Sequence, residues 1–170
     1  RFEVYLYDFG EHIQDKMTKR MIAAADQYRM VKELSNAELV KQVREDEIDI
    51  AIDLMGYTRD NRASIFSKRV APIQLSMQGY PGTTGNDSMD YILADDCLIP
   101  EGEEKYYTEK VIRMPGTSQA MDDTLMPSNK VYTREELGFK DDNFVFCCFS
   151  KPEKIQRKEF QIWMNLLKQR

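Results

Sequence analysis

Two lysines near the carboxyl end of the chain form the clearest anion-binding pattern in this sequence. Lys151 and Lys154 lie in the segment SKPEKI, which follows an apolar run and precedes an amphipathic helix expected to begin near Gln156 or Lys158. Free backbone N–H groups at a helix amino terminus favour a phosphate, and ammonium groups beside them add to this. Ser150 contributes a hydroxyl at the start of the segment. The pattern is typical of a solvated basic loop, and a phosphate site is the functional interpretation of the same residues.

A glycine-rich loop, GYPGTTG at residues 79–85, is the second candidate. It matches neither the phosphate-binding loop of nucleotide hydrolases nor the dinucleotide-binding fingerprint. Its glycines allow positive φ and Pro81 suits the second position of a turn, so a plain turn between two strands is one interpretation. The adjacent hydroxyls of Thr83 and Thr84 favour the other, a loop that contacts a ligand.

The sequence contains no set of residues suited to nucleophilic catalysis or to binding a metal ion. The one histidine, His12, has no cysteine or acidic partner in ligand spacing, and we interpret it as a loop residue. Cys97, Cys147 and Cys148 have neither metal-ligand nor disulfide spacing. Cys147 and Cys148 fall in an apolar run, so we expect buried free thiols in a reducing compartment, the cytoplasm.

Charge and hydropathy exclude two classes of partner. The net charge of −5 gives no overall basic field, so we expect no nucleic-acid partner. The chain has no apolar run of about 18 residues, so we expect no membrane span.

These candidates must be positioned by an α/β fold. Amphipathic helices alternate with β-branched, apolar segments, and Ser35 with Glu38 has the signature of a capping box. This alternation predicts a Rossmann-like parallel sheet, in which ligands bind beyond the carboxyl ends of the strands. Three segments should lie at such ends: 53–58, 79–85 and 150–156. The expected strands are 2–7, 28–31, 48–54, 71–78, 89–95, 111–115 and 143–150, and the expected helices include 16–26, 37–46 and 158–169.

Several of these segments together resemble one known family. The strings APIQ, GYPGTTG and MDYI in this order, followed by YYTEKVIRMP, resemble the catalytic region of the O-GlcNAc transferase and SPINDLY family, glycosyltransferase family 41. Further on, TREELGFKDDNFVFCCFSKPEKI and FQIWMNLLK resemble the start of that family's second catalytic lobe. The similarity extends over essentially the whole chain.

The resemblance implies a GT-B architecture, with two Rossmann-like lobes and a nucleotide sugar between them. On that basis residues 1–115 are part of the amino-terminal lobe, 116–131 a connecting segment, and 132–170 the first strand and helix of the carboxyl-terminal lobe. The remaining parts of both lobes, and the tetratricopeptide repeats that usually select substrates, would lie outside the chain. The chain alone is therefore not expected to turn over.

The resemblance also assigns roles to particular residues. Lys154 resembles the lysine that contacts the donor diphosphate and stabilises the leaving group, which agrees with the helix-start argument, and Tyr57 lies where relatives have His or Tyr. Lys151 and Glu153 depart from the family pattern, where a polar amide and a tyrosine are common. The implied catalytic residues are Lys154 and Tyr57, the donor-binding residues Ser150, Lys151 and Lys154, and the sugar and acceptor cleft residues Thr58, Pro81, Gly82, Thr83 and Thr84.

The implied activity is an inverting transfer of GlcNAc from UDP-GlcNAc to Ser or Thr hydroxyls of proteins, without a metal or other cofactor. Transfer of fucose from GDP-fucose, as in SPINDLY-type members, is an alternative. A relative that has lost catalysis and uses its cleft only to bind nucleotide or protein is another, favoured by Lys151 and Glu153. An unrelated α/β protein with a structural glycine turn is the third.

Overall fold

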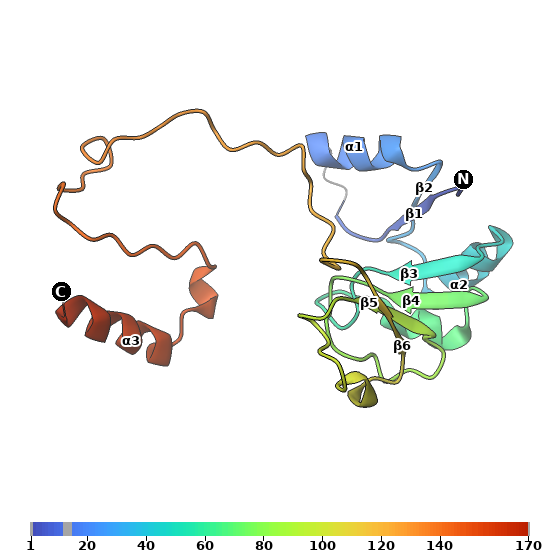
Figure 1. The fold of residues 1–170 in the computed structure, drawn as a ribbon. Helices are drawn as coiled ribbons and strands as arrows, with labels where there is room; N and C mark the ends of the chain where they lie inside the picture. Colours follow the sequence, from blue (N-terminus) through green and yellow to red (C-terminus); the bar gives the residue numbers. More distant parts are fainter. Residues whose placement is uncertain (1, 12–14, 170) are drawn as a thin grey trace. The chain divides into compact units, whose positions relative to one another are not determined.

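The structure is a computed structural model that describes residues 2–11 and 15–169. The chain forms two compact units, Arg1–Asp122 and Asp123–Arg170, and Figure 1 shows each of them. The division falls inside the predicted connecting segment 116–131. His12, interpreted above as a loop residue, lies outside the described residues.

The strands of the first unit are all parallel, but they form two sheets instead of the single sheet expected from the sequence (Figure 1). One sheet pairs β1 with β2, and the other has the order β3-β4-β5-β6. The α/β class and the parallel pairing are therefore confirmed. The strands are β1 Tyr5–Asp8, β2 Gln27–Met30, β3 Ile50–Asp53, β4 Ile73–Ser76, β5 Tyr91–Ala94 and β6 Lys110–Arg113.

Helices connect these strands where the sequence predicts them. The Ser35 side chain accepts a hydrogen bond from the Glu38 backbone N–H and the Glu38 side chain accepts one from Ser35, so the capping box is confirmed. Between β5 and β6 the sequence EEKYYTEK suggests one or two helical turns, and the structure has one short 3-10 helix there. The helical elements of the first unit are α1 Lys16–Ala24, α2 Asn36–Glu45, and the 3-10 helices η1 Ala63–Lys68 and η2 Glu104–Tyr106.

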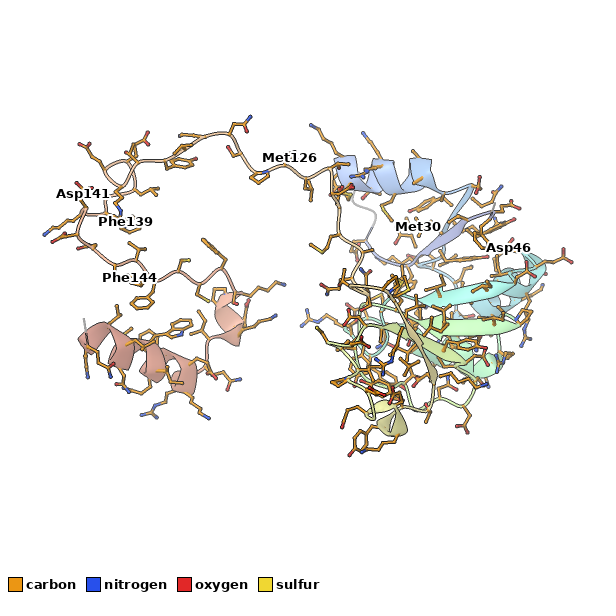
Figure 2. All side chains as sticks on the ribbon, in the orientation of Figure 1. Met30, Asp46, Met126, Phe139, Asp141 and Phe144 are labelled. Carbon is orange, nitrogen blue, oxygen red and sulfur yellow. The ribbon has the colours of Figure 1, made fainter. Side chains whose placement is uncertain are left out.

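Asp46, at the end of α2, ties the smaller sheet to that helix (labelled in Figure 2). Its carboxylate accepts hydrogen bonds from the Tyr7 hydroxyl (2.6 Å) on β1 and from Arg29 Nε (2.7 Å) on β2. Burial raises the pKa of Asp46, but the bonds from Arg29 and Tyr7 outweigh this and leave it below its ordinary value. The carboxylate therefore stays charged and holds three elements together.

The main core lies on one face of the larger sheet, where α2 and η1 pack. Leu39 and Val43 of α2 meet Phe66 of η1 there, with Ala51 of β3 packed against them. The opposite face carries Ile50 and Ile52, which are 41% and 50% exposed. The β-branched composition of 48–54 is typical of a strand buried on both faces, but here helices cover only one face of this strand.

The second unit contains one long helix, α3 Arg157–Lys168, preceded by the 3-10 helix η3 Pro152–Lys154. The predicted helix is confirmed, but the predicted strand 143–150 is wrong, since these residues pair with no strand. Figure 2 shows Phe144 on this extended segment, where its ring lies 4.8 Å from that of Phe146. An apolar strand needs neighbouring strands to satisfy its backbone, and no described residue of this chain provides them.

The expected burial of the thiols is also wrong. Cys97, Cys147 and Cys148 are all exposed free cysteines. Cys147 and Cys148 are exposed because their segment is not part of a sheet.

Asp95, directly after β5, anchors the chain beyond β6. Its carboxylate accepts the backbone N–H groups of Cys97 (3.0 Å) and Leu98 (2.9 Å), and the N–H (2.7 Å) and hydroxyl (2.8 Å) of Ser118. The backbone bonds from Ser118 and Leu98 hold the pKa of Asp95 at about 2, against an ordinary 3.8.

This arrangement gives a pH dependence that can be measured. A lowered pKa means that the stabilisation from Asp95 is present above its ordinary pKa and is lost as the pH falls from about 4 to about 2. We expect Asp95→Asn to lower the unfolding temperature at neutral pH and to flatten its decline in that acidic range. Thermal unfolding between these pH values measures this, with the exposed Asp87→Asn as control. An equal acid slope in wild type and Asp95→Asn contradicts the assignment.

Candidate functional site

The loops that follow β3 and β4 interlock through two glycines. A Cβ added at Gly79 would lie 2.2 Å from the carbonyl oxygen of Leu54, so only glycine permits this approach of backbone to backbone. A Cβ added at Gly56, where φ is +52°, would lie 2.4 Å from the Cβ of Tyr80. Gly79, the first glycine of GYPGTTG, therefore serves loop packing, because it fits against the chain just after β3.

Asp53 and Tyr57 shape the loop after β3. Asp53 Oδ1 accepts the backbone N–H groups of Met55 (2.9 Å) and Gly56 (3.0 Å), which fixes the turn off the strand. The Tyr57 hydroxyl donates to the Thr84 carbonyl at 2.5 Å, and its ring lies edge-on to the Tyr80 ring at 5.5 Å. Tyr57 is nevertheless 54% exposed, so part of its ring remains accessible beside the glycine loop.

The two threonines of the loop turn their hydroxyls toward Glu109. Thr83 Oγ1 donates to Glu109 Oε2 at 2.7 Å, and the Thr84 N–H donates to Oε1 at 2.7 Å. The Thr84 hydroxyl also donates to Oε1, and the Thr108 hydroxyl donates to Oε2 at 3.3 Å. Both loop hydroxyls are therefore used inside the protein, and they present no free proton to a ligand in this arrangement.

Burial raises the pKa of Glu109, but the hydrogen bonds from Thr84 and Thr83 outweigh it and hold the pKa below its ordinary value. Glu109 is 3% exposed, and no Lys or Arg forms an ion pair with it among the residues that the structure describes. The carboxylate is thus held as an anion by hydrogen bonds from uncharged groups.

The stagger of the sheet explains how a residue before β6 reaches a loop after β4. Tyr91, the first residue of β5, pairs with Leu75 of β4 and with Lys110 of β6. Strand β6 therefore begins level with the second half of β4, and Glu109 precedes it directly. Tyr107 adds a further tie, since its hydroxyl donates to the Pro81 carbonyl at 3.1 Å.

The predicted donor-binding residues lie in the second unit. Ser150, Lys151 and Lys154 are exposed, and Pro152–Lys154 forms the 3-10 turn η3 just before α3. Gln156, the residue that precedes α3, provides no side-chain cap, so the first backbone N–H groups of this helix receive none from it. That arrangement fits the predicted phosphate site, and its approach to the glycine loop stays a prediction.

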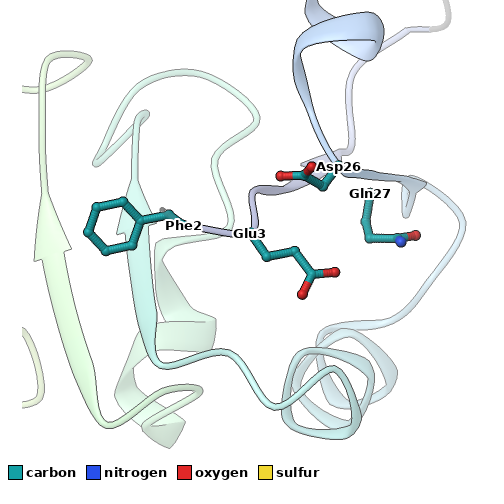
Figure 3. Close-up of a pocket in the computed structure, with 4 residues that line it drawn as sticks. All are labelled: Phe2, Glu3, Asp26 and Gln27. Atoms are coloured by element: carbon teal, nitrogen blue, oxygen red, sulfur yellow. The ribbon is translucent and has the colours of Figure 1, made fainter.

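Two hollows of the first unit lie away from the interlocked loops. One of about 470 Å³, shown in Figure 3, is lined by Phe2, Glu3, Asp26 and Gln27 at the starts of β1 and β2. Another, of about 490 Å³, lies at the starts of β3 and β4. Across residues 2–11 and 15–169 no cluster of His, Cys, Asp and Glu suits a metal ion, and no helix is both long and apolar enough to cross a membrane.

The structure thus brings together one part of the predicted site. Tyr57 and Thr84 are joined directly, while Pro81 and Thr83 are held by the connection between β5 and β6. Thr58 lies in the same loop as Tyr57, and Gly82 packs close to the Tyr80 ring. Glu109, Tyr80 and Tyr107 were not predicted, because nothing in the sequence spacing shows that 107–109 contacts 81–84.

Comparison with known proteins agrees with the sequence pattern. The family model described as glycosyl transferase family 41 matches residues 1–128. The chain belongs to glycosyl transferase family 41. The matched residues cover the first unit, including both interlocked loops and Glu109.

Relatives in this family are similar over most of the chain. The probable UDP-N-acetylglucosamine–peptide N-acetylglucosaminyltransferase SEC of Arabidopsis thaliana is 32% identical over 98% of this chain, which covers 18% of that protein. The corresponding transferase of Caenorhabditis elegans is 31% identical over 69% of this chain, which covers 10% of that protein. The chain therefore spans less than a fifth of these relatives.

Among solved structures, an O-GlcNAc transferase mutant from Thermobaculum terrenum is similar in fold and sequence. It has a TM-score of 0.65 and 37% sequence identity, over 68% of this chain and 22% of that one. The similarity supports the GT-B assignment made from the sequence.

The interlock at Gly79 gives a direct test by substitution. We expect Gly79→Ala to destabilise the first unit by about 3 kcal/mol, because the new methyl group meets the backbone of Leu54 and Met55, just after β3, which cannot move aside. Gly85→Ala is the matched control: its φ is +61° but no atom lies within 4 Å of the added Cβ, so we expect a loss of about 1 kcal/mol. Thermal unfolding of both variants measures the difference. Equal losses contradict the interlock.

Proposed function

We propose that the protein containing this chain is an inverting, UDP-GlcNAc-dependent protein O-glycosyltransferase that acts in the cytoplasm. Membership of glycosyl transferase family 41 carries this proposal, because the matched residues include the loops at 53–58 and 79–85. Relatives named as peptide N-acetylglucosaminyltransferases support it. We further propose that tetratricopeptide repeats elsewhere in the protein select its substrates, which are proteins that present Ser or Thr.

In this reaction the bond between the sugar C1 and the diphosphate oxygen breaks, and a bond from C1 to the Ser or Thr oxygen forms. The hydroxyl proton of the acceptor passes to a base, and negative charge develops on the departing diphosphate. We assign the stabilisation of that charge to Lys154, with Lys151, Ser150 and the amino terminus of α3 beside it. This arrangement needs no metal ion.

The interlocked loops form a wall of the sugar and acceptor cleft in this proposal. Tyr57 and Thr58 line it from the end of β3, and residues 81–84 line it from the loop after β4. Because the Tyr57 proton is donated to the Thr84 carbonyl, the remaining lone pairs of the phenolic oxygen can accept a hydrogen bond from a ligand. Tyr57 therefore orients a hydroxyl group of substrate.

GDP-fucose is kept as the competing donor because the sequence resemblance left it open. The probable UDP-N-acetylglucosamine–peptide N-acetylglucosaminyltransferase SPINDLY of Arabidopsis thaliana, 30% identical over 79% of this chain, is named for the same donor that we propose. Transfer from GDP-fucose and binding without catalysis are therefore the two competing outcomes of the test below.

Lys154→Ala in the full-length protein tests the leaving-group role. We expect transfer from labelled UDP-GlcNAc to fall roughly 100-fold or more, since a charge that acts in the transition state is removed. Lys168→Ala, at the far end of α3, is the control and should leave transfer unchanged. Addition of EDTA should also leave it unchanged.

Each contrary result has its own meaning. If only GDP-fucose labels protein, the donor is GDP-fucose and not UDP-GlcNAc. If UDP binds but no protein is labelled, the enzymatic proposal is contradicted. Transfer by Lys154→Ala at the wild-type rate removes the role of this lysine.

A further inference from the structure

Glu109 is a buried carboxylate of the first unit that no lysine or arginine of the described residues pairs with. It lies in the connection before β6, is 3% exposed, and receives hydrogen bonds from both threonines of the glycine loop. Burial of a carboxylate without a cation is costly unless donors surround it. An uncharged residue would avoid that cost, so a carboxylate at this position suggests that the donors need an acceptor that only an anion provides.

The donors around Glu109 are constrained by their other partners. Thr83 Oγ1 already accepts the N–H groups of Gly85 (3.1 Å) and Thr108 (3.2 Å), so its two lone pairs are occupied and it can only donate. Glu109 Oε2, at 2.7 Å, is a closer acceptor for its proton than the Thr108 hydroxyl at 3.1 Å. The Thr84 N–H, 2.7 Å from Oε1, is a backbone donor with a fixed direction. One carboxylate oxygen therefore faces Thr83 and the other faces Thr84, and both must be acceptors.

Glutamine has the same shape but satisfies this arrangement less fully. In one orientation its NH₂ group faces the N–H of Thr84, and in the other it faces the saturated oxygen of Thr83 and has only the Thr108 oxygen, at 3.3 Å, to accept from it. A protonated Glu109 has the same defect, which agrees with its lowered pKa. The ionised carboxylate is therefore the form that accepts all of these donors.

Thr84 connects this carboxylate to Tyr57. Its N–H is bound by Glu109, and its carbonyl oxygen accepts the Tyr57 hydroxyl. The peptide groups on both sides of Thr84 are therefore fixed, and with them the position of a half-exposed aromatic ring at the end of β3. The tie from Tyr107 to the Pro81 carbonyl holds the other side of the loop.

We propose that Glu109 is a positioning residue for the transfer reaction: its ionised carboxylate sets the loop 79–85 and, through Thr84, orients Tyr57 toward the acceptor. The inference rests on the proposed function for its consequence in catalysis. In this proposal Lys154 contacts the donor diphosphate, and Glu109 affects only the binding and orientation of the acceptor.

Glu109→Gln in the full-length protein is the test. We expect kcat/KM for an acceptor peptide to fall about tenfold or more, while the dissociation constant of UDP changes less than about twofold, because misplacement affects only the acceptor side. Glu101→Gln, an exposed glutamate in the same connection, is the matched control and should behave as wild type. Wild-type kinetics in Glu109→Gln would overturn the proposal.

A double-mutant cycle separates positioning from loss of stability. If Glu109 acts through Thr84 on Tyr57, then Tyr57→Phe and Glu109→Gln together should lower kcat/KM little more than the larger of the single effects. A double effect equal to the product of the single effects overturns the coupling. Thr83→Val should lower kcat/KM in the same direction, and Thr83→Ser, which keeps the hydroxyl bound by Glu109, should lower it less. This pair decides the question if Glu109→Gln does not fold.

Hydrogen exchange keeps the test independent of activity. In the full-length protein, Glu109→Gln should speed exchange of the amides in 79–85 and leave α2 unchanged. An inactive wild-type protein contradicts the proposed function, whereas unchanged exchange in 79–85 contradicts the role of Glu109 in setting the loop.

Discussion

The approach of Gly79 to the carbonyl oxygen of Leu54 governs how the candidate site is built. At this point the backbone after β4 lies against the backbone at the end of β3, with no space for a Cβ. Because of this contact, Tyr80 can pack over Gly56, and Tyr57 can reach the Thr84 carbonyl. The contact is therefore the constraint on which the shape of the wall depends.

Hydrogen bonds to three buried carboxylates fix turns and loops of the first unit, and none of the three forms an ion pair with Lys or Arg within residues 2–11 and 15–169. Asp53 fixes the turn after β3, Glu109 fixes the loop after β4, and Asp95 fixes the chain beyond β6. Each receives backbone N–H groups with fixed directions, so each defines one backbone path. A glycosyltransferase that relies on electrostatic stabilisation gains from such rigidity, because groups that are already in place need not reorganise during the reaction.

Much of this fold could be predicted from the sequence, because many of its elements are determined by contacts between residues close together in the chain. The Ser35 and Glu38 capping box and the apolar periodicity of α3 depend on neighbours within a few residues, and both are confirmed. The strand expected at 143–150 needs partner strands that the described residues do not provide. Its apolar composition therefore predicted a strand that the structure does not have. Hydropathy indicates that a segment can be a strand, but pairing decides whether it becomes one.

The candidate site shows the same limit. Tyr57 and the glycine loop were visible as motifs. Glu109 was not, because it lies 25 residues along the chain from Thr84, whose N–H it accepts. Only the stagger of β4, β5 and β6 brings them together, and no residue pattern encodes that register.

A crystal structure of the full-length protein with UDP-GlcNAc and an acceptor peptide would test the central claim most directly. The account predicts that the Lys154 ammonium group contacts the diphosphate, while Tyr57 and the loop 79–85, still hydrogen-bonded to Glu109, contact the sugar or the acceptor. A complex in which the diphosphate is held without Lys154, and the acceptor lies away from that loop, would contradict it.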